Sequence, residues 1–133
     1  MVEGMKFHHI GIACENIDET ASHYRLLGYK QGDIVIDPLQ NIKISFLSHP
    51  VLPLLELLEP IDENSPVVDI LKKNGTTPYH ICYSVANLEE CITSLRKESF
   101  LIVSKPKVAN AIEGNRVAFL YNKAVGLIEL VGQ

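Results

Sequence analysis

The chain has 133 residues, of which 47% are hydrophobic and 21% are charged, a composition that is typical of a folded globular protein and excludes a disordered one. The net charge of −4, with no basic stripe containing aromatic residues, argues against nucleic-acid binding. The sequence has no apolar run of membrane-spanning length, no signal pattern and no C-x-x-C motif, so we expect a cytoplasmic protein that has no membrane partner.

The first half of the sequence predicts a strand, a helix and three further strands. Apolar alternation indicates a strand over 7–13. Asn16 is placed as a helix N-cap with Glu19 three residues later, as in a capping box, and Gly28 is placed as the glycine that ends the helix. Three short apolar stretches follow, near 33–36, 42–47 and 54–58.

The second half predicts the same plan after a short linker helix. Ser65 as N-cap and Pro66 at the first helical position predict this linker helix over about 65–74. A strand over 79–85 and a helix from the N-cap Asn87 to about residue 98 follow. Further strands are expected near 100–103, 116–121 and 126–131, and residues 104–115 are expected to form a loop.

An internal repeat relates the two halves. Residues 9–30 match residues 80–101, and residues 43–58 match residues 116–131. The matched identities include His9 with His80, Phe46 with Phe119, Glu56 with Glu129 and Leu57 with Leu130. A tandem repeat can fold into a pseudo-twofold structure in which equivalent positions converge. We therefore expect one domain over 1–133, with an α+β fold, a first repeat over about 6–58 and a second over about 78–131.

The repeated polar residues have the chemistry of metal ligands. His9 and His80 share their strand faces with small residues, which leaves space beside the imidazoles. Glu56 and Glu129 lie in apolar strands, where a buried carboxylate needs a partner. One divalent ion bound by all four residues would provide it, and a ligand set without thiolate suits Zn, Ni, Co, Mn or Fe. Four protein ligands would leave coordination positions open, as in catalytic sites.

Each of these residues also has an ordinary explanation. A single buried histidine is more often a hydrogen-bonded core residue than a ligand, and a single glutamate can point to solvent from an apolar strand. The repeat favours the metal site because both residue types occur twice at equivalent positions. His8, His23 and His49 have no such counterparts, and we interpret them as surface or packing residues. The three cysteines are interpreted as small buried hydrophobes.

The same segments carry a family resemblance that covers nearly the whole chain. They are residues 8–13, residues 56–60 followed by Ser65-Pro66, residues 80–83, and residues 117–120 leading to 126–130. Together they resemble the vicinal oxygen chelate superfamily of glyoxalases, bleomycin-resistance proteins and extradiol dioxygenases, and within it the methylmalonyl-CoA epimerases and glyoxalase I-like members. The resemblance implies two tandem βαβββ modules, which form a curled mixed sheet around a metal site, commonly in a homodimer.

The resemblance also implies the site residues and the chemistry. The metal ligands of the family fall on His9, Glu56, His80 and Glu129, with Glu129 as the first choice for the base and Glu56 as its partner. The metal ion would polarise a carbonyl while a carboxylate moves the proton of the neighbouring carbon. The expected substrate is a small molecule, such as a thioester of coenzyme A or glutathione.

Two departures and two alternatives remain open. The epimerases often have His-His where this chain has Tyr79-His80, and some carry a second acid/base carboxylate in the stretch that is acid-free here, residues 41–46. Lactoylglutathione lyase activity is therefore an alternative to epimerisation, and a drug-binding protein is the alternative of another class. Arg116 and Lys43, at equivalent repeat positions, are the basic residues that we most expect to guide an anionic group.

Overall fold

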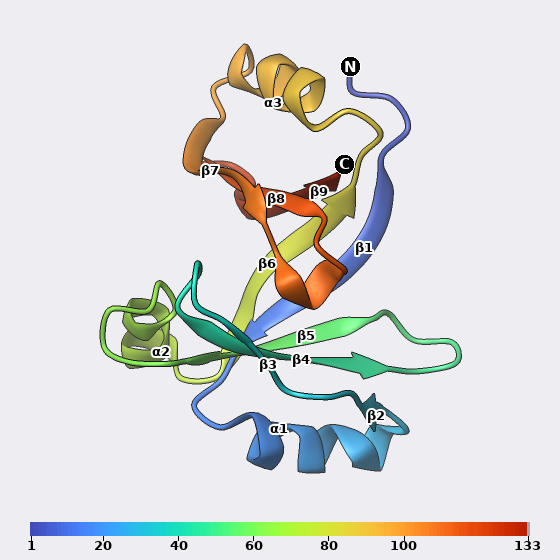
Figure 1. Ribbon diagram of the computed structural model, residues 1–133, viewed down its shortest axis with the longest axis vertical. Coiled ribbons are helices and arrows are strands. Elements are labelled where there is room, and N and C mark those ends of the chain that lie inside the picture. The colour runs from blue at the N-terminus through green and yellow to red at the C-terminus, as the bar shows by residue number, and fades with distance from the viewer. Residues whose placement is uncertain (133) are drawn as a thin grey trace. The chain divides into compact units, whose positions relative to one another are not determined.

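Two β-sheet units make up the residues that the computed structural model describes, which are 1–132 without the side chain of Asn110. One unit contains residues 9–79. The other contains residues 1–8 together with the residues from His80 onward. The strands β1 and β6 each cross the boundary between these stretches of chain. Figure 1 shows the elements of both units in their chain colours.

The unit of residues 9–79 has a sheet with strand order β2-β4-β5-β1, and β3 also pairs with β4. Strands β1 and β5 are parallel, whereas the other pairs are antiparallel. A turn of 3-10 helix at Arg25–Leu27 follows the first helix. The elements are β1 (Lys6–Ala13), α1 (Ile17–Tyr24), β2 (Lys30–Gln31), β3 (Val35–Asp37), β4 (Ile42–Ser48), β5 (Leu55–Pro60) and α2 (Val68–Asn74).

The other unit repeats this plan with strand order β6-β9-β8-β7. Strands β6 and β9 are parallel, as β1 and β5 are, and the remaining pairs are antiparallel. A 3-10 turn at Asn110–Ile112 separates β7 from β8. The elements are β6 (Thr77–Ser84), α3 (Leu88–Arg96), β7 (Leu101–Val108), β8 (Arg116–Asn122) and β9 (Gly126–Gly132). The predicted β-α-β-β-β order is thus present in the second half, and the first half has it with one additional short strand after α1, β2, which the sequence did not predict.

Each unit has an apolar core between its sheet and one helix. In the first unit, Ile17 and Ala21 of α1 pack with Ile12 of β1 and with Leu47, Leu55 and Leu57 of β4 and β5. In the second unit, α3 does the same through Leu88, Cys91 and Ile92, which pack with Ala118, Leu120, Ile128 and Leu130. In each unit, the apolar residues that alternate along the strands therefore lie on the sheet face that packs against the helix. The repeated histidines and glutamates lie on the opposite face.

The predicted N-caps of both helices are confirmed. The Asn16 side chain accepts a hydrogen bond from the backbone N–H of Glu19 at 2.9 Å, and the Asn87 side chain accepts one from Glu90 at 3.0 Å. Gly28 has a φ of 93°, in the left-handed region that favours glycine, and ends the 3-10 turn after α1.

We expect Asn16→Ala and Asn87→Ala each to lower the free energy of unfolding by about 1 kcal/mol, because each leaves a helix N–H without its cap. Urea unfolding followed by circular dichroism measures the loss. The matched control is Asn74→Ala at the exposed end of α2, where the change should stay within about 0.5 kcal/mol. Equal losses in all three variants would contradict a capping role.

Two predicted segments differ from the structure. The loop expected over 104–115 is wrong for its first part, because β7 continues to Val108 with register shifts near Ser104. Pro106 suggested a loop, but β7 is an edge strand, where a residue without an N–H is tolerated. The linker helix begins at Val68 rather than near residue 65. Ser65 lies in a turn before the helix, and its backbone carbonyl accepts a hydrogen bond from the N–H of Val68.

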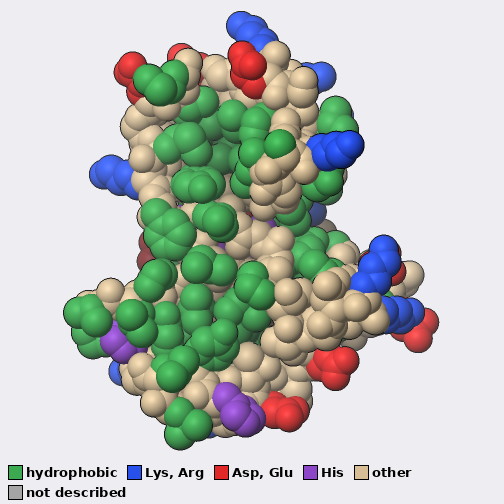
Figure 2. Space-filling model, turned by 180° about the vertical axis from the view of Figure 1, so that it is seen from behind, with side chains coloured by type: hydrophobic (Ala, Val, Ile, Leu, Met, Phe, Trp, Pro, Cys, Tyr) green, Lys and Arg blue, Asp and Glu red, His purple; other side chains and the backbone are tan. Residues whose placement is uncertain are grey.

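The surface of each unit keeps exposed apolar side chains, which gather on the face drawn in Figure 2. The exposed apolar residues include Leu26, Leu27 and Val51 in the first unit, and Phe7, Leu101 and Val103 in the second. Exposed apolar patches often mark interaction surfaces. The homodimer stays a prediction. Among the described residues, no helix combines the length and the apolar character needed to cross a membrane.

Candidate metal centre

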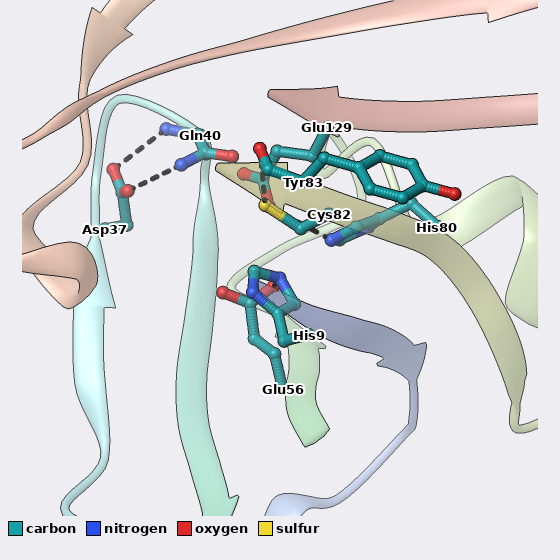
Figure 3. A network of polar contacts seen from close by, with 8 residues as sticks. All are labelled: His9, Asp37, Gln40, Glu56, His80, Cys82, Tyr83 and Glu129. Carbon is teal, nitrogen blue, oxygen red and sulfur yellow. Dashed lines mark hydrogen bonds and ion pairs between the residues drawn. The ribbon is translucent and has the colours of Figure 1, made fainter. Parts of the chain in front are cut away.

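The first His–Glu pair, His9 with Glu56, lies on one face of the first unit's sheet. Gly11 of β1 is in register with Glu56 of β5, and His9 precedes Gly11 by two residues, so both side chains project from the same face. His9 Nε2 and Glu56 Oε1 lie 3.1 Å apart, and both residues are buried. We call this the site face of the first unit. Figure 3 shows the two side chains next to each other.

The second His–Glu pair, His80 with Glu129, has the same construction in the other unit. Cys82 of β6 is in register with Glu129 of β9, and His80 precedes Cys82 by two residues. His80 Nε2 and Glu129 Oε1 lie 3.2 Å apart, and both residues are buried. The structure thus brings together the predicted ligands of each half.

A phenylalanine ring contacts the histidine in each pair. Phe46 is in register with Glu56, and its ring meets His9 edge-on, with centroids 5.4 Å apart. Phe119 is in register with Glu129, and its ring meets His80 edge-on at 5.2 Å. Each phenylalanine ring limits the movement of the imidazole that it contacts. The repeat already matched the two phenylalanines, but no sequence pattern assigned them this role.

Burial makes both carboxylates dependent on partners, because a buried charge is costly unless it is paired. Each carboxylate has its histidine, and a carboxylate has further lone pairs with which it can bind a cation. In composition, His9, Glu56, His80 and Glu129 are two imidazoles and two carboxylates, a donor set that can hold a divalent metal ion. The residues present therefore fit a metal, but they do not select one.

The two basic residues expected to guide an anionic group are engaged in ion pairs. Lys43 Nζ lies 3.4 Å from Glu59 Oε2, and the other oxygen of Glu59 accepts from the backbone N–H of Ile17 at the start of α1. Arg116 contacts the Glu89 carboxylate of α3, and this hydrogen bond lowers the pKa of Glu89. A role of these cations toward a ligand stays a prediction.

His23 and His49 agree with their interpretation as surface or packing residues, and the cysteines with theirs as buried side chains, whereas the interpretation of His8 stays a prediction. His23 is exposed, and His49 Nδ1 accepts hydrogen bonds from the N–H groups of Val51 and Leu52 in a turn. All three cysteines are buried. Burial raises the pKa of the Cys14 thiol to about 11, which keeps it protonated at neutral pH.

A second buried polar group, Asp37 with Gln40, was not singled out from the sequence. Asp37 ends β3 and Gln40 lies in the turn that leads to β4, and their exposed fractions are 0% and 9%. Asp37 Oδ1 accepts from the backbone N–H groups of Leu39 and Gln40, and Asp37 Oδ2 accepts from Gln40 Nε2 at 2.8 Å (Figure 3). An aspartate before a turn is common, so the sequence contained no signal that this one is buried.

Comparisons with known proteins agree with this arrangement. Residues 8–119 match the family model described as the Glyoxalase/Bleomycin resistance protein/Dioxygenase superfamily. The mitochondrial methylmalonyl-CoA epimerase of Homo sapiens is 29% identical over 129 residues, which are 94% of this chain and 72% of the human protein.

Two solved structures are also similar. The methylmalonyl-CoA epimerase of Mycobacterium tuberculosis superposes with a TM-score of 0.84 at 27% identity, covering 95% of this chain and 86% of that one. A variant of the Streptomyces coelicolor methylmalonyl-CoA epimerase, in complex with 2-nitronate-propionyl-CoA, superposes with a TM-score of 0.82 at 28% identity, covering 96% of both chains.

Proposed function

The chain belongs to the Glyoxalase/Bleomycin resistance protein/Dioxygenase superfamily, and from this premise we propose that it is a divalent-metal-dependent enzyme that resembles methylmalonyl-CoA epimerase. Its proposed reaction is the removal and return of a proton on the carbon next to the carbonyl of a small thioester. The observation that carries the proposal is the buried His–Glu pair that occurs once in each unit, with the same register and the same phenylalanine contact.

In this proposal, His9, Glu56, His80 and Glu129 hold one divalent ion. Support comes from the matching ligand types in the two repeats, from their burial, and from the lack of thiolate among them. When bound, such an ion polarises the substrate carbonyl and makes the neighbouring C–H more acidic. The phenylalanines hold the imidazoles in place, and the apolar surroundings limit access of water to the carboxylates.

The proton is moved by the carboxylates of the two pairs. Glu129 is proposed as the base and Glu56 as the partner that returns the proton from the opposite face of the carbon. No acid projects from the site face of β4, a strand described over its whole length, where Ile42, Ile44 and Phe46 alternate with residues of the helix-facing side. An epimerisation would therefore use both pair carboxylates.

The same observation favours lactoylglutathione lyase activity as the second candidate. That reaction also moves a proton between neighbouring carbons beside a thiol carrier, and carboxylates of the two pairs suffice for it. The cytoplasmic location and the homodimer belong to the proposal as expectations, and a ligand-binding protein of the same fold is the alternative that metal and activity assays exclude.

Metal analysis tests the site first. We expect about one divalent ion per chain in protein purified without a metal-binding tag, and loss of that ion in His9→Ala and His80→Ala. His23→Ala is the matched control and should keep the ion, because His23 is exposed. Thermal unfolding identifies variants that fail to fold. Protein that binds none of Zn, Ni, Co or Mn when they are added would overturn the metal-dependent proposal.

Substrate assays follow on the metal-loaded protein. Exchange of the substrate proton with deuterium from solvent, followed by NMR, is expected with methylmalonyl-CoA. The hemithioacetal of methylglyoxal and glutathione tests the second candidate, through formation of the lactoyl thioester. A metal-loaded protein that acts on neither would contradict both activities and favour a binding protein.

A further inference from the structure

A cavity of about 660 Å³ opens on the surface of the second unit, where the end of α3 meets strand β7. Cavities of this size commonly hold small organic ligands. The stretch 97–100 joins the two elements, which lie next to each other in Figure 1. The residues that line the cavity are four apolar ones and two cations, with no acid among them: Arg96, Phe100, Leu101, Ile102, Val103 and Lys105.

The apolar part of the cavity has a packed floor and exposed walls. Phe100 and Ile102 are half-buried and pack on the core beneath α3. Leu101 and Val103 have exposed fractions of 67% and 60%, so they leave apolar surface in contact with water. Val103 lies at a register shift, where β7 has a residue without a partner in β8. Covering these side chains with an apolar group removes that surface from water and favours binding.

The two cations of the cavity are available to an anionic group. Among the residues that the structure describes, Arg96 and Lys105 take part in no ion pair and no side-chain hydrogen bond. Glu98 is close to Arg96 in the chain, but it does not line the cavity. A cavity with cations and no acid attracts negative charge.

The internal repeat indicates that the fold does not require this composition. In the first unit, Arg25 donates to Gln31 at 3.0 Å, and Gln31 donates to Asp18 at 3.0 Å. At the spacing of the repeat, Arg96 is the counterpart of Arg25. The counterpart of Gln31 is Ile102, whose side chain cannot accept a hydrogen bond. The second unit therefore has a cation beside an apolar side chain where the first unit has an internal polar network.

The features of β7 favour a small molecule over a protein partner. The strand is at the edge of its sheet, but the irregular pairing at Val103 and the missing N–H of Pro106 are features that oppose the addition of another strand. A second copy of the chain would contribute the same patch to a twofold interface, so that cations would face cations. A ligand bound through its contacts with side chains avoids both difficulties.

We propose that this cavity binds a dissolved carboxylate with an unbranched alkyl chain, such as a fatty acid. The alkyl chain covers Leu101, Ile102 and Val103, and the carboxylate pairs with Arg96 and Lys105. The arrangement matches the lining in both respects, because the ligand is apolar along its length and anionic at one end. This site is additional to the His–Glu pairs, and the inference does not rest on the proposed function.

Calorimetric titration with decanoate, below the concentration at which it forms micelles, tests the site. We expect one decanoate per chain, bound about 4- to 15-fold more tightly than octanoate, because two more methylene groups are covered. Decyltrimethylammonium has the same chain with a cationic head, and it should not bind. Equal binding of the two amphiphiles, or an affinity that does not increase with chain length, would overturn the inference.

Charge variants locate the carboxylate. Arg96→Gln and Lys105→Gln should each weaken decanoate binding about 2- to 5-fold, because each removes one exposed ion pair. Lys97→Gln is the matched control, since it removes the same charge from an exposed neighbour outside the cavity, and it should leave the affinity unchanged. Equal weakening in all three variants would show only a general attraction by positive charge and would rule out this site.

Ile102→Gln tests the apolar floor, because it copies the arrangement of the first unit. The new amide can accept from Arg96 and reduces the apolar surface, so decanoate binding should weaken more than in either charge variant. Thermal unfolding shows whether this variant is folded, and unchanged binding in the folded variant would contradict the placement of the alkyl chain.

Vesicles distinguish a dissolved ligand from a membrane. Sedimentation with vesicles of phosphatidylglycerol and phosphatidylcholine presents anionic heads and alkyl chains in a bilayer, and we expect the protein to remain in the supernatant. A protein that sediments with the vesicles but does not bind dissolved decanoate would overturn the inference in favour of a membrane contact.

Discussion

Glu129→Gln is expected to lower kcat by about 10²- to 10⁴-fold in protein that is folded and saturated with metal. Glutamine keeps the shape of the side chain and can still bond to His80, which lies 3.2 Å from the carboxylate, but it cannot accept a proton at neutral pH. The rate of deuterium incorporation at the carbon next to the carbonyl, followed by NMR, measures the loss directly.

Two further variants make this result specific. Glu98→Gln, in the same unit, removes an exposed carboxylate, and it should keep wild-type turnover. Glu56→Gln should slow epimerisation more than deuterium exchange, because Glu129 can still remove a proton from its own side. Wild-type exchange in metal-saturated Glu129→Gln would contradict its role as the base.

Leu57→Ala and Leu130→Ala are expected to cause the largest losses of stability, about 2–5 kcal/mol each. The two leucines are at equivalent repeat positions, each has an exposed fraction of 0%, and each packs beneath the helix of its own unit. Shortening either side chain removes apolar contacts and leaves a cavity that the surrounding sheet and helix fill only in part.

Urea unfolding by fluorescence of the tyrosines and by circular dichroism measures these losses. The matched controls are Leu26→Ala and Leu101→Ala, whose side chains are exposed and whose effects should stay within about 0.5 kcal/mol. A core variant that loses no more stability than its exposed control would contradict the assignment of that leucine to the core.

The strands and helices that could be predicted are those whose pattern is local. Apolar alternation marked β1 and β6, and the side chains of Asn16 and Asn87 cap α1 and α3 as their spacing predicted. The repeat added information of longer range, because it matched His9 with His80 and Glu56 with Glu129 before any contact was known. The repeat did not predict that each histidine contacts the glutamate of its own half, because this contact depends on the register of β1 on β5 and of β6 on β9.

The features that could not be predicted depend on neighbours far along the chain. Whether Pro106 ends β7 depends on the strand being at a sheet edge, and no sequence pattern shows that position. The ion pair of Lys43 with Glu59 depends on the register of β4 on β5. The burial of Asp37 likewise depends on how β3 pairs with β4. Aspartate is common before turns, so its position in the sequence did not indicate that this side chain is buried.

The division of β1 between the two units has a consequence for protein synthesis. The unit of residues 9–79 is one continuous stretch and can form all its strand pairs as soon as that stretch has left the ribosome. Residues 1–8 belong to the other unit, whose last strand, β9, is made more than a hundred residues later. We expect residues 1–8, although translated before the rest of their unit, to be among the last to reach their final packing on the ribosome.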